Sequence, residues 1–188
     1  MQQPPVRLLH PRRFGDARGW FTETYNRDTF AALGIGCTFV QDNHSLSEPA
    51  YTLRGLHFQT PPRAQDKLVR CVRGRIFDVA VDLRRGSPSY GQWVGAELSA
   101  ADGDQLFIPV GFAHGFVTLE PACEVVYKCS DTYAPAQDGG IAWDSAGIDW
   151  PIPAGIVPEL SAKDRVQPTL AAFDSPFDYD GRPLTPLA

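Results

Sequence analysis

The sequence predicts an all-β fold in which short strands form a double-sheet jelly roll or a small barrel, with a few short peripheral helices. Glycine and proline, 17 of each, interrupt the chain at short intervals. The runs between them are rich in Val, Phe, Trp, Tyr and Thr, a pattern typical of strands separated by turns. Because the strands are short and evenly spaced, they favour two packed sheets or a closed barrel, whose mouth is a usual ligand site.

Eight segments carry the strand pattern, and several of them are too apolar to alternate between buried and exposed positions. We therefore expect a second sheet or a partner subunit to cover these strands, rather than a single sheet with one face in water. The predicted strands are residues 20–25, 38–43, 67–73, 75–83, 92–98, 105–108, 115–119 and 124–129.

One helix is predicted at residues 26–34, where Asn26 is placed to cap the first turn and Gly34 to end the helix. Beyond about residue 144 the chain becomes Pro-rich, and a Pro-rich tail begins at about residue 169. We expect this part to wrap over the body. No repeat of solenoid length and no domain linker is visible, so residues 1–188 are predicted to form one domain.

The composition is that of a soluble globular protein, with 43% apolar and 21% charged residues. The net charge is -5 and the basic residues form no single run, so we expect no nucleic-acid partner. No apolar stretch approaches membrane-spanning length, and the leader MQQPPVRLLHPRRFGD lacks the apolar centre of a signal peptide. We therefore expect no membrane association and a cytoplasmic location. The four cysteines show no CxxC spacing and are expected to be buried free thiols.

His57 is the first candidate for catalysis. It lies in the segment RGLHFQ, where strand alternation places Leu56 and Phe58 on one face and His57 and Gln59 on the other. Ten residues later Lys67 opens a predicted strand, and its ammonium group is suited to polarise a carbonyl or to pair with a phosphate.

A histidine that removes a proton from carbon usually has a buried carboxylate partner, which fixes its tautomer and stabilises the imidazolium. Asp164 is one candidate, and Asp78 and Asp82 on predicted strands are others; spacing alone does not choose among them. Tyr127 lies on a predicted strand with its phenol on the same face as Val125. An aromatic residue of the core, with its hydroxyl hydrogen-bonded, would show the same pattern.

His114 follows a turn, and the plain interpretation is a hydrogen-bonded histidine in a tight corner. A metal site needs a cluster of ligands, often including a His-x-His pair on one strand face, and this chain has no such pair. We expect chemistry without a metal or other cofactor. Spacing leaves open a site made of His57, His114 and one carboxylate.

Six segments together resemble the dTDP-4-dehydrorhamnose 3,5-epimerases. They follow one another in the order and spacing of that family up to about Pro168, and RGLHFQ with KLV ten residues after its histidine is the most specific combination. The Pro-rich tail has no counterpart. The segments are DARGWFTE from Asp16, QDNHS from Gln41, RGLHFQ from Arg54, KLVRCVRGRIFDVAVDLR from Lys67, GFAHGF from Gly111 and LSAKD from Leu160.

The resemblance implies a double-stranded β-helix, the jelly roll of the cupin type, and a homodimer with strands exchanged between subunits. It assigns His57 as general base, Asp164 as its dyad partner, Tyr127 as general acid and Lys67 as the cation near the keto oxygen. Tyr133 is implied to stack on the thymine ring. Contacts with nucleotide or sugar are implied for Arg18, Glu23, Gln41, Asn43, Arg54, His114, Asp138 and Lys163. Asp138 stands where many members have Glu, so its contact is shortened or made through water.

The implied reaction is epimerisation at C3 and C5 of dTDP-4-dehydro-6-deoxy-D-glucose, which gives dTDP-4-dehydro-L-rhamnose. The 4-keto group acidifies the protons on both carbons, so one base serves both if the enolate oxygen is stabilised. Three alternatives stay open: a mono-epimerase acting at C3 or C5 only, a metal-dependent cupin enzyme, and a nucleotide-sugar-binding module without chemistry.

Overall fold

The computed structural model describes residues 6–187. Residues 1–5, which begin the leader considered above, and Ala188, which ends the Pro-rich tail, lie outside the described residues. The elements in chain order are β1 (Arg7–Leu9), β2 (Arg13–Asp16), β3 (Gly19–Thr22), α1 (Arg27–Ala32), β4 (Gln41–Ser47), β5 (Leu53–Gln59), β6 (Lys67–Arg73), β7 (Arg75–Asp82), β8 (Trp93–Ser99), β9 (Gln105–Ile108), β10 (Phe112–Thr118), β11 (Cys123–Cys129), β12 (Asp138–Gly140) and the 3-10 turns η1 (Asp164–Val166) and η2 (Leu170–Ala172).

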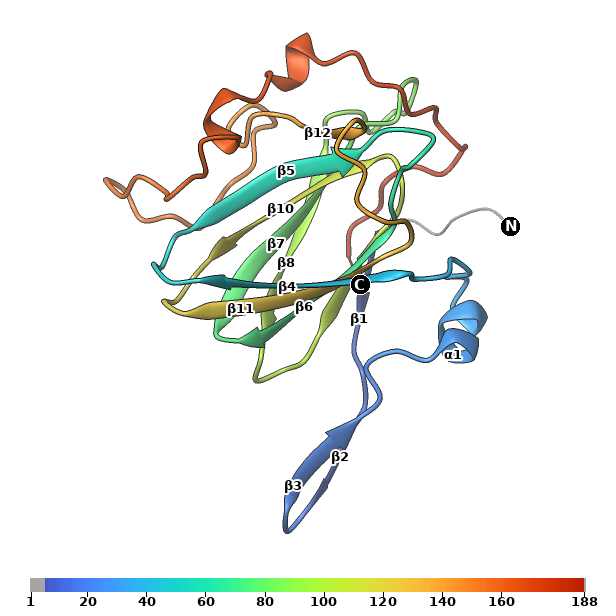
Figure 1. The fold of residues 1–188 in the computed structure, drawn as a ribbon, viewed down its shortest axis with the longest axis vertical. Helices are drawn as coiled ribbons and strands as arrows, with labels where there is room; N and C mark the ends of the chain where they lie inside the picture. The colour runs from blue at the N-terminus through green and yellow to red at the C-terminus, as the bar shows by residue number, and fades with distance from the viewer. Residues whose placement is uncertain (1–5, 188) are drawn as a thin grey trace.

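Two five-stranded sheets face each other, as Figure 1 shows. The first has the order β1-β9-β6-β11-β4 and the second β12-β5-β10-β7-β8, with antiparallel pairing throughout. A separate hairpin of β2 and β3 stands away from this body (Figure 1). The predicted jelly-roll architecture of the cupin type is therefore confirmed.

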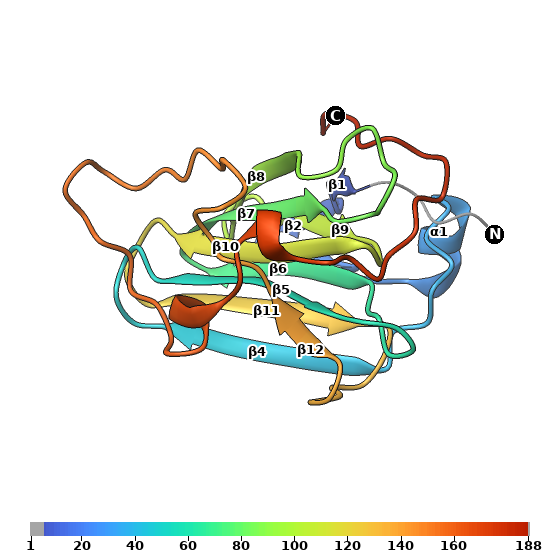
Figure 2. The same ribbon diagram turned by 90° about the horizontal axis from the view of Figure 1, so that it is seen from above.

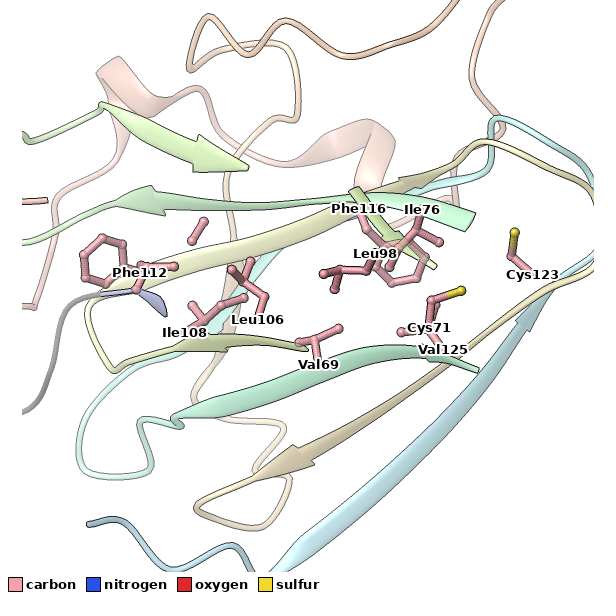
Figure 3. Packing of buried hydrophobic residues seen from close by; sticks show 12 residues of the cluster. Val69, Cys71, Ile76, Leu98, Leu106, Ile108, Phe112, Phe116, Cys123 and Val125 are labelled. Atoms are coloured by element: carbon pink, nitrogen blue, oxygen red, sulfur yellow. The ribbon is translucent and has the colours of Figure 1, made fainter. Parts of the chain in front are cut away.

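The main core fills the space between the two sheets (Figure 3). Alternate residues of facing strands point inward and exclude water, which is the dominant favourable term in folding. The buried members include Val69, Cys71, Ile76, Leu98, Leu106, Ile108, Phe112, Phe116 and Val125.

The outer face of the second sheet and part of the outer face of the first are also covered, which explains why several strand sequences do not alternate. Leu56, Phe58, Val79 and Val81 pack under residues after β12, which run orange to red over the second sheet in Figures 1 and 2. On the first sheet, a cluster of Phe30, Ile35, Leu68 and Phe107 lies beneath α1. The expected cover on both faces is present for the strands under the C-terminal segment and under α1, whereas the outer side of β4 and its neighbour β11 is partly exposed in this chain.

Most predicted strands are present, although several of them begin or end at other residues than predicted. The segments predicted at 67–73 and 105–108 coincide with β6 and β9, whereas β4 begins at Gln41 rather than at residue 38. The pattern missed β1, β2, β12 and the full extent of β5. In β5 the glycine of the RGLHFQ motif weakens the strand pattern in the sequence. A Cβ at Gly55 would lie 2.6 Å from the Cα of Gly115 on β10, so the close contact of these strands requires glycine.

The predicted helix is present as α1. Asn26 accepts hydrogen bonds from the backbone N–H groups of Asp28 and Thr29 at 3.0 and 3.2 Å, which satisfies the first-turn donors. The chain leaves the helix through Gly34, whose φ of +82° is a conformation that glycine adopts at little cost. Among the described residues, no helix is long and apolar enough to cross a membrane.

The Pro-rich tail returns to the body and is anchored there. Phe177 is buried against the outer cluster of the second sheet, and the Ser175 hydroxyl donates to the Leu83 carbonyl. Arg84, itself buried, pairs with Asp82 at 2.8 Å and with Asp180 of the tail at 2.9 Å. The tail therefore wraps over the body, as expected from its composition.

Candidate active site

Two cavities of about 440 and 420 Å³ lie between the sheets and share three residues, His57, Lys67 and Tyr127. The first cavity is also lined by Arg54, His114, Ser161 and Asp164, and the second by Gln41, Asn43, Gln59, Tyr133, Asp138 and Lys163. Strands β5 and β10 of one sheet, β4, β6 and β11 of the other, and the turn η1 thus bring together residues that are far apart in sequence.

His57 and Asp164 form a hydrogen-bonded pair, with Nε2 of the imidazole 2.5 Å from Oδ1 of the carboxylate. Burial alone would raise the pKa of Asp164. The hydrogen bond and charge of His57, together with a hydrogen bond to the Ser161 side chain, outweigh this effect and hold the pKa below its ordinary value. The ionised carboxylate keeps the proton of a neutral His57 on Nε2. Nδ1 of His57 is then left as the basic nitrogen.

Lys67 is buried beside this pair, and its ammonium donates to the backbone carbonyl of His57 at 3.3 Å. Burial lowers the pKa of Lys67, and the neighbouring Cys129, Asp78 and Asp138 act in the opposite direction. A cation held in a site with little water interacts strongly with negative charge that develops on a nearby oxygen.

Tyr127 on β11 lines both cavities together with His57. Its inward position follows from strand alternation, because Val125 two residues earlier belongs to the main core. Burial raises the pKa of the Tyr127 phenol, so the hydroxyl keeps its proton at neutral pH and can donate it. Its ring centre lies 6.4 Å from that of His114.

Five of the residues to which the resemblance assigns contacts with the substrate line the second cavity. Asp138 Oδ2 accepts from the Tyr133 hydroxyl at 3.0 Å and from the Lys163 ammonium at 2.5 Å. The side-chain oxygen of Gln41 accepts from the backbone N–H of Tyr133 at 2.8 Å, and its nitrogen donates to Asn43 at 3.1 Å. Tyr133 is 57% exposed, so an aromatic side chain is available to a flat ligand.

His114 is buried and makes a second histidine–aspartate pair, with Nε2 2.7 Å from Oδ1 of Asp78. Sequence reasoning considered Asp78 as a partner of His57, and the structure pairs it with His114 instead. Among residues 6–187, no group of three His, Cys, Asp or Glu side chains is arranged so that it could hold a metal ion.

Arg18 and Glu23 are the two predicted site residues that line neither cavity. Arg18 lies at the exposed tip of the β2–β3 hairpin, where it pairs with Asp16 at 2.5 Å. Glu23 follows β3 and accepts from Asn26 at 3.2 Å. Because the hairpin stands away from the body (Figure 1), one chain does not bring these two residues to His57.

Comparison with known proteins gives the family. The sequence model of the dTDP-4-dehydrorhamnose 3,5-epimerases matches residues 2–172. This chain belongs to that family. The match includes the residues of both cavities and ends before most of the Pro-rich tail.

Individual epimerases agree along nearly their whole length. The dTDP-4-dehydrorhamnose 3,5-epimerase of Salmonella typhimurium is 54% identical over 89% of this chain and 91% of the relative. A Legionella pneumophila dTDP-6-deoxy-D-glucose-3,5-epimerase, solved with dTDP-4-keto-L-rhamnose, superposes with a TM-score of 0.86 at 41% identity, covering 93% of each chain. The Bacillus anthracis epimerase, solved with TDP and PPi, has a TM-score of 0.84 at 49% identity and covers 87% of this chain and 93% of its own.

Sequence reasoning missed one residue that organises the epimerase cavity. Gln59 is buried, accepts from the backbone N–H of Ala134 at 2.7 Å, and donates to the carbonyls of Arg63 and Thr132 at 2.6 and 3.3 Å. It thereby connects the loop that contains Arg63 to the loop that carries Tyr133. Its place on the same strand face as His57 was the available signal.

Proposed function

We propose that this chain epimerises C3 and C5 of dTDP-4-dehydro-6-deoxy-D-glucose and that His57 is its general base. The observation that carries the proposal is the His57–Asp164 pair in a cavity that also contains Lys67 and Tyr127. These groups supply a base, an oxyanion stabiliser and an acid, which are the three functions required for inversion next to a carbonyl.

In the proposed reaction, Nδ1 of His57 takes the proton from C3 or C5, and the electron pair of the broken C–H bond moves into the enolate. Lys67 stabilises the enolate oxygen at C4, and Asp164 stabilises the imidazolium. Tyr127 then donates its proton to the same carbon from the opposite face, which inverts the centre. Proton exchange with solvent returns His57 and Tyr127 to their starting states.

The nucleotide half of the substrate is proposed to lie in the second cavity. Tyr133 would stack on the thymine ring, since an aromatic platform stabilises a stacked base by about 1–3 kcal/mol. Gln41, Asn43, Asp138 and Lys163 line the same cavity and supply polar contacts. We assign Arg54 and His114, which line the first cavity, to the sugar and diphosphate.

We also propose a homodimer in which the β2–β3 hairpin delivers Arg18 and Glu23 to the partner's cavity. The support is the hairpin's exposed apolar surface: Phe14, Trp20 and Phe21 are 51, 60 and 69% exposed, which is costly unless a second surface covers them. The test is complementation between Arg18→Ala and His57→Ala. If Arg18 acts in the partner, a mixed dimer of the two variants has one intact site and regains activity; if it acts in its own subunit, the mixed dimer regains none.

The decisive experiment on the reaction is proton exchange. Chelator-treated protein is incubated with dTDP-4-dehydro-6-deoxy-D-glucose in deuterated water, and deuterium at C3 and C5 is followed by NMR. Incorporation at both carbons is expected. Incorporation at one carbon would instead identify a mono-epimerase, binding without incorporation a non-catalytic module, and activity that returns only with added metal a metal-dependent enzyme.

A cytoplasmic location is proposed as well. Its support is the set of four cysteines, all of them free thiols, of which Cys71, Cys123 and Cys129 are buried. Unpaired cysteines are usual in reducing compartments. Alkylation of the native protein and of the unfolded protein would count the reduced thiols after extraction.

A further inference from the structure

Asp78 is a buried carboxylate that the proposed reaction does not use. It lies on β7, is fully buried, and faces the interior between the sheets, as do Ile76 and Ala80 on either side of it along the strand. One of its oxygens, Oδ1, is 2.7 Å from Nε2 of His114. The other, Oδ2, is buried and has no hydrogen-bond partner among residues 6–187. A carboxylate in such a position is costly for stability, so its presence calls for a role in the site.

The position of His114 connects this carboxylate to the candidate active site. His114 on β10 is the register partner of His57 on β5, and both line the first cavity with Lys67. Burial lowers the pKa of His114 despite the opposing charge of Asp78, so the imidazole is neutral at neutral pH. A neutral imidazole has one donor nitrogen and one acceptor nitrogen, and the carboxylate takes the donor.

We propose that Asp78 is a positioning residue that fixes His114 in the Nε2–H tautomer, so that Nδ1 of His114 accepts a hydrogen bond from a hydroxyl group of the bound sugar. The inference rests on the proposed function for the identity of that sugar. The two residues would then make different polar contacts in the cavity: the Lys67 ammonium, which only donates, serves the keto oxygen, and Nδ1 of His114, which only accepts, serves a hydroxyl.

The charge of Asp78 has a second consequence for the same site. Lys67 is buried and forms no ion pair with a carboxylate among residues 6–187, and Asp78 is one of the groups that favour its protonated form. Asp78 therefore supports both the acceptor on His114 and the cation on Lys67. Neither effect requires Asp78 to touch the substrate.

The test compares Asp78→Asn with Asp82→Asn. Asp82 lies four residues further along β7, is also fully buried, and is hydrogen-bonded to Arg84, Ser87 and Ser89 outside the cavities. Asp78→Asn is expected to lower kcat by about tenfold or more, the loss that follows from one charge-assisted hydrogen bond, with the melting temperature unchanged or raised. Asp82→Asn is expected to lower the melting temperature and to leave kcat of the folded protein unchanged. Binding of dTDP, which lacks the 4-keto-6-deoxyhexose of the substrate, should be the same in Asp78→Asn as in the wild type.

The tautomer itself is measured without turnover, by long-range ¹⁵N–¹H correlation spectra in which His114 is assigned by comparison with His114→Gln. The proposal predicts a neutral ring with its proton on Nε2 in the wild type. A proton on Nδ1 or a doubly protonated ring would overturn it, and so would an Asp78→Asn variant that keeps full kcat or loses activity only in parallel with its folded fraction. Because the NMR result needs no substrate, it separates failure of this inference from failure of the proposed reaction.

Discussion

His57 and His114 lie side by side as register partners on adjacent strands β5 and β10, and each is hydrogen-bonded through Nε2 to a different aspartate. The two pairs differ in exposure: the His57 side chain is 31% exposed, whereas that of His114 is 7% exposed. The more accessible imidazole is the one that we propose as the general base. The buried one is better suited to hold a ligand group in place.

His57→Ala is expected to abolish deuterium incorporation at both C3 and C5, because the same imidazole is proposed to abstract both protons. Far-UV circular dichroism and the melting temperature should change little, since His57 lies on the cavity side of its strand. Residual incorporation at one carbon in this variant would show that a second base serves that carbon.

Tyr127→Phe is expected to retain some proton exchange while losing net inversion. The phenyl ring keeps the packing of the Val125 face, and only the donor hydroxyl is removed. Exchange is read from deuterium incorporation into recovered substrate and inversion from the product's NMR couplings. Nearly full epimerase activity in the Phe variant would remove Tyr127 from the role of acid.

Asp164→Asn is expected to lower kcat by about a hundredfold or more, because the amide no longer holds the imidazole in the right tautomer. It should also change the acid stability. The pKa of Asp164 in the folded state lies below its ordinary value of 3.8, so the ionised carboxylate stabilises the fold above that pH, and this contribution is lost as the pH falls through the folded-state pKa. Melting temperatures of the two proteins should therefore converge in acid. A difference in melting temperature between the two proteins that stays constant over the whole pH range would contradict the stabilising role of ionised Asp164.

Tyr133 provides a test of nucleotide stacking. Tyr133→Ala is expected to raise KM by about tenfold with kcat nearly unchanged, because a stacking platform contributes about 1–3 kcal/mol. Tyr133→Phe keeps the ring and loses only the hydrogen bond to Asp138, so its KM should rise much less. Equal increases in the two variants would assign the effect to the hydroxyl rather than to the ring.

Phe177 tests whether the tail is part of the core. It is 4% exposed and its ring centre lies 5.7 Å from that of Phe58, so Phe177→Ala should lower the free energy of unfolding by about 3–5 kcal/mol. Val157→Ala, at a position that is 81% exposed, serves as the control and should change it by no more than about 0.5 kcal/mol. Urea denaturation measures both, and a small effect at Phe177 would mean that the tail packs only loosely.

Much of the secondary structure could be predicted because the signals are local. Asn26 and Gly34 predicted the ends of α1 correctly, since a cap and a left-handed glycine act within a few residues. The β5 strand was recognised only through the alternation around His57. Gly55 interrupts the propensity pattern there for a reason that lies 60 positions away in sequence, in the close contact with Gly115.

The sequence by itself determined the β architecture, the helix, the inward face of RGLHFQ and the resemblance that led to the family. Spacing alone left the pairing of carboxylates with histidines undecided, because Asp78, Asp82 and Asp164 were equivalent in a linear pattern, and the resemblance singled out Asp164 without a geometric reason. The tertiary structure supplies that reason: β7 places Asp78 behind His114, η1 carries Asp164 to His57 across 107 positions, and Asp82 is held by Arg84. Hydrogen bonds are decided by distances of a few ångströms between elements, and those distances are set by sheet register and by the path of the C-terminal segment rather than by spacing along the chain.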